Sequence, residues 1–141
     1  MPRSIRALLA ATLFTIVLAA AADVEAFALP TGAWTIIGNG FIGTLQINSV
    51  DAPGNLNATV YGNTMLGYYD AARNHITFLR QFGPNLNQIQ YYTGSLHASS
   101  VVVGANCLFL LSGTLETYGF WASAVQNEYG WVAFQQVPCG P

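Results

Sequence analysis

Apolar and polar residues alternate along most of the chain that follows residue 32, so that every second side chain has the same character. The clearest example is residues 41–48, where one face carries Phe41, Gly43, Leu45 and Ile47. A period of two places successive side chains on opposite sides of a β-strand. The pattern predicts eight strands, at residues 33–37, 41–48, 56–62, 64–70, 75–82, 88–98, 107–117 and 131–137.

Turn-forming residues separate these predicted strands. Residues 38–40 and 62–63 allow tight reversals, and residues 51–55 combine a proline, which presets φ, with a glycine, which accepts a positive φ. We expect a longer connection at 99–106, while residues 119–130 fit either a helical turn or a crossing loop. Short strands separated by glycine- and proline-bearing turns indicate a β-sandwich or an up-and-down barrel.

Glycine recurs inside three of the strands, each time followed by a hydroxyl residue and leucine. The copies begin at Gly43, Gly94 and Gly113. Glycine weakens a strand unless the sheet bends sharply there or an aromatic ring lies over the bare backbone, and small closed barrels need such positions repeatedly. We therefore predict an all-β fold, an eight-stranded antiparallel up-and-down β-barrel. An outer-membrane barrel is the rival, but it needs strands of about 9–11 residues, and most of these are shorter.

The first 22 residues have the pattern of a secretory signal peptide. Arg3 and Arg6 precede an apolar run, and three alanines precede Asp23. A membrane-spanning helix is the alternative, but it needs about 20 apolar residues, and this run stops short of that. We predict a signal peptide at 1–22, a flexible leader at 23–32 and one barrel domain at 33–141. The protein would then be secreted or periplasmic, with no membrane span in the mature chain.

The charge of the chain without its signal peptide excludes two classes of partner. Two arginines, Arg73 and Arg80, stand against six acidic residues with no lysine, so the charge is 2 − 6 = −4. Nucleic-acid binding requires clustered cations, and so does binding to an anionic membrane surface. We expect neither partner.

Two cysteines, Cys107 and Cys139, remain after removal of the signal peptide. In an exported chain, an even cysteine count favours a disulfide. Metal binding is the alternative, but no recognisable ligand spacing accompanies these cysteines. We predict the disulfide, and neither a metal nor a cofactor.

Four short segments resemble the avidin and streptavidin family. They are Gly32-Ala33-Trp34, Gly67-Tyr68-Tyr69-Asp70, Tyr92-Thr93-Gly94, and Ser112-Gly113-Thr114 followed by Trp121. A lipocalin-like barrel has similar segments. The resemblance implies a secreted barrel that holds a small ligand at its mouth. It also aims Tyr92 and Gly94 inward but Gly113 outward, whereas the repeated glycine pattern predicts one shared environment.

The family's biotin contacts are mostly not matched in this sequence. Ile36, Gly40 and Leu108 stand where the resemblance places an asparagine, a serine and a tryptophan, while Trp121 does match. A buried ureido group without its hydrogen-bond partners loses about 1–3 kcal/mol for each missing contact. We expect no tight binding of biotin.

Seven residues are candidates for lining a ligand site: Trp34, Tyr69, Arg80, Gln90, Tyr92, Leu110 and Trp121. Arg80 is unusual because it shares a strand face with Phe78 and Phe82. A buried arginine needs a partner. We favour a structural ion pair with Asp70 or Glu116, and a bidentate contact with a ligand carboxylate is the alternative.

No residues in the sequence form a recognisable catalytic set. His75 and His97 lie in separate strands without a nearby nucleophile or paired carboxylate. We therefore predict a non-catalytic barrel that binds a small or hydrophobic ligand in or near its mouth. The alternative is a structural subunit that assembles with itself, since the late strands are apolar on both faces and one face must lie outside. The assembly would bury Leu108, Leu110 and Trp131 or their neighbours on the opposite face. A homo-oligomer is expected in either case.

Overall fold

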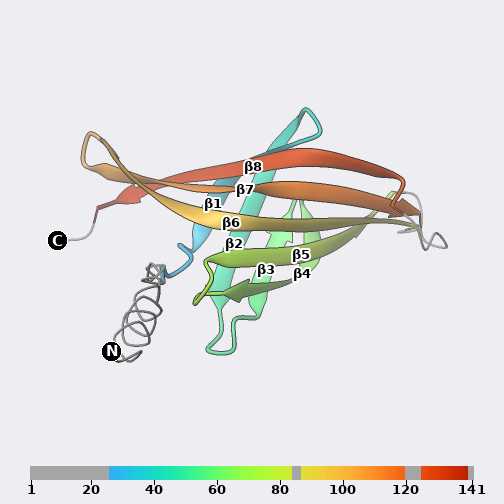
Figure 1. The fold of residues 1–141 in the computed structure, drawn as a ribbon, viewed down its shortest axis with the longest axis horizontal. Helices are drawn as coiled ribbons and strands as arrows, with labels where there is room; N and C mark the ends of the chain where they lie inside the picture. Colours follow the sequence, from blue (N-terminus) through green and yellow to red (C-terminus); the bar gives the residue numbers. More distant parts are fainter. Residues whose placement is uncertain (1–25, 84–86, 120–124, 140–141) are drawn as a thin grey trace, which may run out of the picture.

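The computed structural model describes residues 26–83, 87–119 and 125–139, apart from the side chains of residues 98–103. The predicted signal peptide and Trp121 lie outside this part. Each strand is antiparallel to its neighbours, and β8 pairs with β1, so the sheet closes into an eight-stranded barrel as predicted (Figure 1). The strands are β1 Gly32–Gly38, β2 Phe41–Val50, β3 Leu56–Val60, β4 Asn63–Asp70, β5 His75–Phe82, β6 Gln88–Val103, β7 Asn106–Gly119 and β8 Asn127–Pro138. The described part of the chain contains no helix long and apolar enough to cross a membrane.

Two of the predicted boundaries are wrong at the ends of the late strands. The connection expected at 99–106 is instead strand up to Val103, with only Gly104 and Ala105 in the turn. A register shift between Ala98 and Val102 interrupts the pairing there, which explains why the alternating pattern was lost. The unassigned segment 119–130 includes the start of β8, while residues 120–124 lie outside the described part.

Two-residue turns with positive φ join β1 to β2 and β3 to β4. Asn39 and Gly40 have φ of 50° and 78°, and Tyr61 and Gly62 have φ of 49° and 79°. These values fit the type I′ turns that match the twist of paired strands. The second reversal was expected one residue later, at 62–63. Tyrosine with positive φ is uncommon, and this turn brings Tyr61 to one end of the barrel.

Aromatic side chains fill the middle of the barrel. Phe78 stacks on Tyr92 with ring centroids 4.4 Å apart, and Trp131 meets both rings edge-on at 5.5 and 5.8 Å. Trp131 is only 3% exposed, so its predicted place in an outer apolar patch is wrong. These three rings form a layer across the barrel that separates its two ends. Aliphatic residues complete the core: Ile36, Leu45, Ile47, Val60, Ile76, Leu111 and Leu115.

The three strand glycines share the interior face, as their repeated pattern predicted. Gly94 and Gly113 are register partners, which overturns the arrangement with Gly113 pointing outward. A Cβ added at Gly43 would lie 2.2 Å from the Tyr61 ring, and one at Gly94 would lie 2.7 Å from the Trp131 ring. Gly43 and Gly94 therefore make room for aromatic rings over the bare backbone, whereas Gly113 allows the backbone of β6 to approach, since a Cβ there would lie 1.9 Å from Thr93 O.

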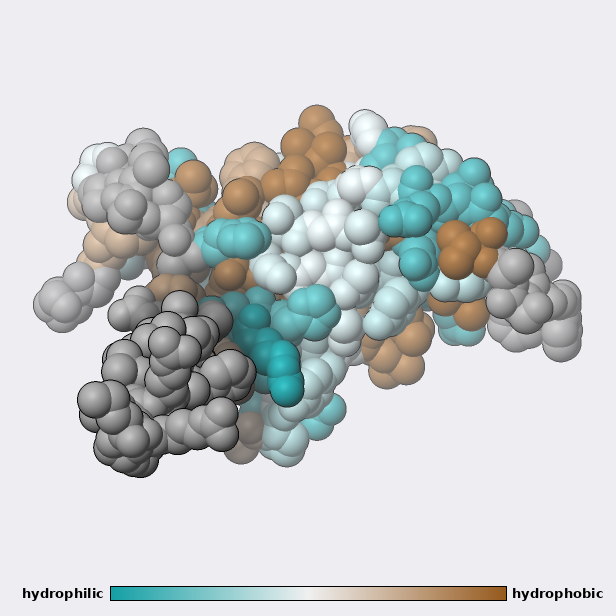
Figure 2. All heavy atoms as spheres, viewed as in Figure 1, coloured by the Kyte–Doolittle hydropathy of each residue, from teal (hydrophilic) through white to brown (hydrophobic). Residues whose placement is uncertain are grey.

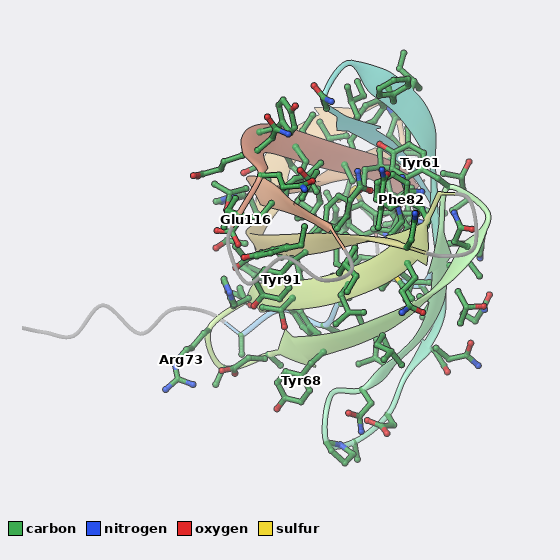
Figure 3. All side chains as sticks on the ribbon, turned by 90° about the vertical axis from the view of Figure 1, so that its right-hand side faces the viewer. Tyr61, Tyr68, Arg73, Phe82, Tyr91 and Glu116 are labelled. Atoms are coloured by element: carbon green, nitrogen blue, oxygen red, sulfur yellow. A yellow bond between two sulfur atoms is a disulfide. The ribbon has the colours of Figure 1, made fainter. Side chains whose placement is uncertain are left out.

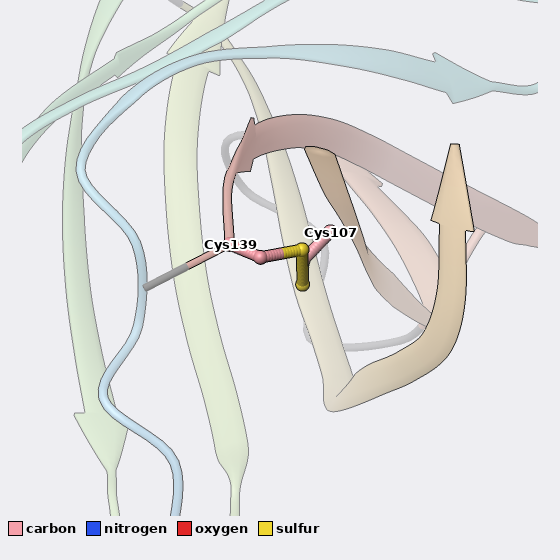
Figure 4. Close-up of a disulfide and its surroundings, with 2 residues drawn as sticks. All are labelled: Cys107 and Cys139. Atoms are coloured by element: carbon pink, nitrogen blue, oxygen red, sulfur yellow. A yellow bond between two sulfur atoms is a disulfide. The ribbon is translucent and has the colours of Figure 1, made fainter. Parts of the chain in front are cut away.

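A disulfide joins Cys107 to Cys139, as predicted (Figure 4). It ties the residue that follows β8 to the start of β7, and the two cysteines are 32 positions apart in the sequence. This bond lies at the end of the barrel where β1 begins and β8 finishes (Figure 1).

Candidate ligand-binding site

The two ends of the barrel differ in how they are covered. A cavity of about 480 Å³ opens at the end that carries the turns after β1, β3, β5 and β7, and we call it the open mouth. Figure 3 looks toward this end, with Tyr61 and Phe82 near one another and Tyr68 and Tyr91 around the outside. The open mouth is lined by Gly38, Asn39, Phe41, Ile42, Tyr61, Arg80, Phe82, Gln88, Gln90, Tyr92, Thr117, Tyr118, Gln126, Asn127 and Tyr129.

Among the residues that the structure describes, Arg80 is the only charged one that lines the open mouth. The alternation of β5 carries its side chain inward, on the face of buried Phe78. The guanidinium carbon lies 4.6 Å from the centroid of the Tyr61 ring and 4.8 Å from that of Phe82. Cation–π contacts of this kind contribute about 0.5–2 kcal/mol each and hold the flat guanidinium in one orientation. Gly43 supports the arrangement because its bare backbone accommodates the Tyr61 ring.

Gln90 connects Arg80 to Tyr92. Its Oε1 accepts one hydrogen bond from Arg80 Nε at 2.5 Å and another from the Tyr92 hydroxyl at 2.8 Å. Burial raises the pKa of the Tyr92 phenol well above its usual value, an effect that Arg80 partly offsets. Tyr92 therefore stays protonated and remains a donor to Gln90 at ordinary pH.

The expected ion pair between Arg80 and a carboxylate is not formed. Asp70 instead bonds to Arg73 at 2.6 Å, and Glu116 accepts a hydrogen bond from the Tyr118 hydroxyl. Arg80 instead donates through Nε to Gln90, and a side-chain hydrogen bond from Arg80 to Tyr92 acts against the rise in the pKa of that phenol. Arg80 lines the open mouth, and a guanidinium has five N–H donors, so the two hydrogen bonds leave it further donors.

The rest of the open mouth combines aromatic rings, amides and an apolar rim. Phe41 and Ile42, beside the β1–β2 turn, are 69% and 73% exposed. Gln88 and Asn127 add side-chain amides, and Tyr129 adds a ring from β8. Apolar walls with a few convergent polar groups are typical of small-molecule sites.

The chain itself covers the opposite end, which we call the closed end. Phe27 N donates to Asn74 Oδ1 at 2.8 Å, and the Tyr69 hydroxyl donates to Phe27 O at 2.7 Å. Trp34 Nε1 donates to the carbonyl of Pro30 at 3.1 Å, and Leu29 is buried. The described part of the predicted leader is thus bonded across this end of the barrel.

The predicted site residues divide among these regions. Arg80, Gln90 and Tyr92 come together in the open mouth. Trp34 and Tyr69 belong to the closed end, where they bond to residues 27–30. The outward-facing Leu110 pairs in register with His97 and Phe134, whereas Trp121 lies outside the described residues.

Sequence reasoning missed two residues that hold Arg80, namely Tyr61 and Phe82. Phe82 was placed on the inner face of its strand, so its contact with Arg80 was within reach of the alternating pattern. Tyr61 was assigned to a strand, and only its position before Gly62-Asn63 hinted at a turn.

The comparisons with known proteins found no match. No protein-family model, curated protein or solved structure is similar to this chain. The resemblance to the avidin family therefore stays a prediction.

Proposed function

We propose that this protein is an exported, non-catalytic barrel that binds a small ligand in its open mouth. The observation that carries the proposal is a preformed cavity of about 480 Å³ in which Arg80, Gln90 and Tyr92 converge. Sites for small ligands are typically clefts of about 300–1,000 Å³ with few, well-placed polar groups. The hydrogen-bonded pair of Gln90 and Tyr92 is already in place, so binding would require little rearrangement.

Export is supported by two separate features. The first 22 residues have the charge and hydrophobicity of a signal peptide. The disulfide between Cys107 and Cys139 suits an oxidising compartment.

A variant that fills the open mouth tests the proposal. Thr117 lines the cavity, and Thr114 faces outward on the same strand, so Thr117→Trp and Thr114→Trp are a matched pair. We expect native mass spectrometry of protein from its own source to detect a bound small molecule in the wild type and in Thr114→Trp, but not in Thr117→Trp. Gln88→Trp, at the exposed start of β6, serves if Thr117→Trp does not fold. The proposal would be refuted if Thr117→Trp and Gln88→Trp retained the small molecule as well as the wild type does, or if the wild type carried no bound molecule.

Self-association is a second candidate function, favoured by an apolar row on the outer face. Leu66 pairs with Leu79, which pairs with Tyr91, and Leu66 is 70% exposed. In the view of Figure 2, hydrophobic residues form separate groups rather than one continuous patch. We expect sedimentation velocity to detect a homo-oligomer that Leu66→Glu weakens more than Thr64→Glu on the same strand. A lone monomer at micromolar concentration would exclude this function.

A further inference from the structure

We infer that the ligand of the open mouth is a small organic carboxylate with a flat apolar body, and that Arg80 binds its charged group. This inference rests on the proposed function, since it assigns a chemical class to the same site. It differs from the expected ion pair within the chain, which the structure does not contain.

The hydrogen-bonding groups of the open mouth favour an acceptor. Arginine can only donate, so Gln90 must turn its oxygen toward Arg80 Nε, where that oxygen also accepts from Tyr92. The amide nitrogen of Gln90 is then left to donate elsewhere. Together with the terminal nitrogens of Arg80, the site offers several donors, for which a carboxylate supplies the acceptors.

Arg80 is also held before any ligand arrives. Its guanidinium lies between the Tyr61 and Phe82 rings, and its Nε is bonded to Gln90. An arginine fixed in this way loses little conformational freedom when it forms a bidentate contact. Such a held cation suits a group that receives an anion.

The distribution of charge favours a single negative group. In the described part of the chain, no acidic residue lines the open mouth, and Arg80 is its one cation. Glu116 and Glu128 are register partners whose neighbours Leu115 and Tyr129 face inward, so both carboxylates face outward. A monoanion would neutralise Arg80, whereas a phosphate dianion would leave a second charge uncompensated in a half-buried site.

The walls of the open mouth determine the rest of the ligand. Tyr61, Phe82 and Tyr129 present rings, and the exposed rim adds Phe41 and Ile42. Rings stack well on flat apolar groups. The predicted ligand is therefore an aromatic or similarly flat monocarboxylate small enough for the cavity.

Isothermal titration calorimetry with 2-naphthoate and its neutral amide, 2-naphthamide, tests this inference. We expect the wild type to bind the carboxylate about 10- to 100-fold more tightly than the amide, as for hydrogen bonds to charged groups. Arg80→Gln should remove that preference, and Arg80→Lys should restore only part of it, because lysine lacks the flat fork. Arg73→Gln is the matched control, since Arg73 is exposed and lies outside the open mouth.

The outcomes separate this inference from the proposed function. If the wild type bound both probes with equal affinity and Thr117→Trp bound neither, the open mouth would still be a ligand site, but the carboxylate assignment would be overturned. A preference for 2-naphthoate that survives in Arg80→Gln would also overturn it, whatever the result for Arg73→Gln. Failure of both probes to bind at millimolar concentration would count against both proposals. Thermal unfolding of each variant verifies that it is folded.

Discussion

The closed end and the open mouth each contain a tyrosine paired with a side-chain amide, but the two pairs have different further partners. At the closed end, the Tyr69 hydroxyl lies 3.2 Å from Asn74 Oδ1. In the open mouth, the Tyr92 hydroxyl lies 2.8 Å from Gln90 Oε1. Both pairs bring a tyrosine and an amide together inside the barrel, where polar groups must find partners.

What differs is the third partner of each pair. Asn74 and Tyr69 bond to the backbone of Phe27, so the chain satisfies its own polar groups there. Gln90 bonds to Arg80, a charged side chain that lines the open mouth. The polar groups at the closed end bond to the chain itself, whereas those of the open mouth line the cavity in which we propose that a ligand binds.

Removing the disulfide should have the largest effect on the closed end. We expect the double variant Cys107→Ser/Cys139→Ser to lose about 3–4 kcal/mol of unfolding free energy, because the bond restricts the unfolded chain over a loop of 32 positions. Urea unfolding of the oxidised wild type and the variant measures this loss.

The control for that variant is ligand binding in the open mouth. Under conditions where the variant is folded, its affinity for 2-naphthoate should equal that of the wild type, because the disulfide lies at the other end. Hydrogen exchange should increase around Cys107 more than around Thr117, which lines the open mouth. Unchanged stability, or lost binding by the folded variant, would contradict the separation of the two ends.

Much of the open mouth could be predicted from local pattern. Alternation along 75–82 placed Arg80 and Phe82 on the inner face because a strand has a period of two. The strand glycines likewise indicated where rings would lie against the backbone. The cross-strand pairing that selects Gln90 as the partner of Arg80 depends on register, which the sequence specifies less directly.

The closed end could not be predicted in the same way. Phe27 and Asn74 are 47 positions apart, and no periodic pattern links a leader to a turn. Asn74 has a φ of 51°. The direction of its side-chain amide depends on this backbone conformation, which the alternating pattern does not specify. Tyr61 was missed for a similar reason, since its place follows from an uncommon positive φ.

Removing one hydroxyl from each pair gives a smaller and more selective test. Tyr69→Phe should cost about 1–3 kcal/mol of unfolding free energy, because the partly buried carbonyl of Phe27 loses its donor. Tyr92→Phe should cost less, because Gln90 Oε1 keeps its bond to Arg80. Equal losses in the two variants would show that the third partner does not distinguish the two ends.

The stability difference between the wild type and Tyr69→Phe should also depend on pH. Burial raises the pKa of Tyr69 from 10.0 to about 12, with a further contribution from Asp70. Between these values the unfolded chain loses the phenolic proton while the folded chain keeps it, so wild-type stability falls as the pH rises. Phenylalanine lacks that proton, and the advantage of the wild type should therefore be full below pH 10 and shrink above it. Unfolding in urea at pH about 8 and about 11 measures the change, and an advantage that stays constant would mean that Tyr69 is not protected by the closed end.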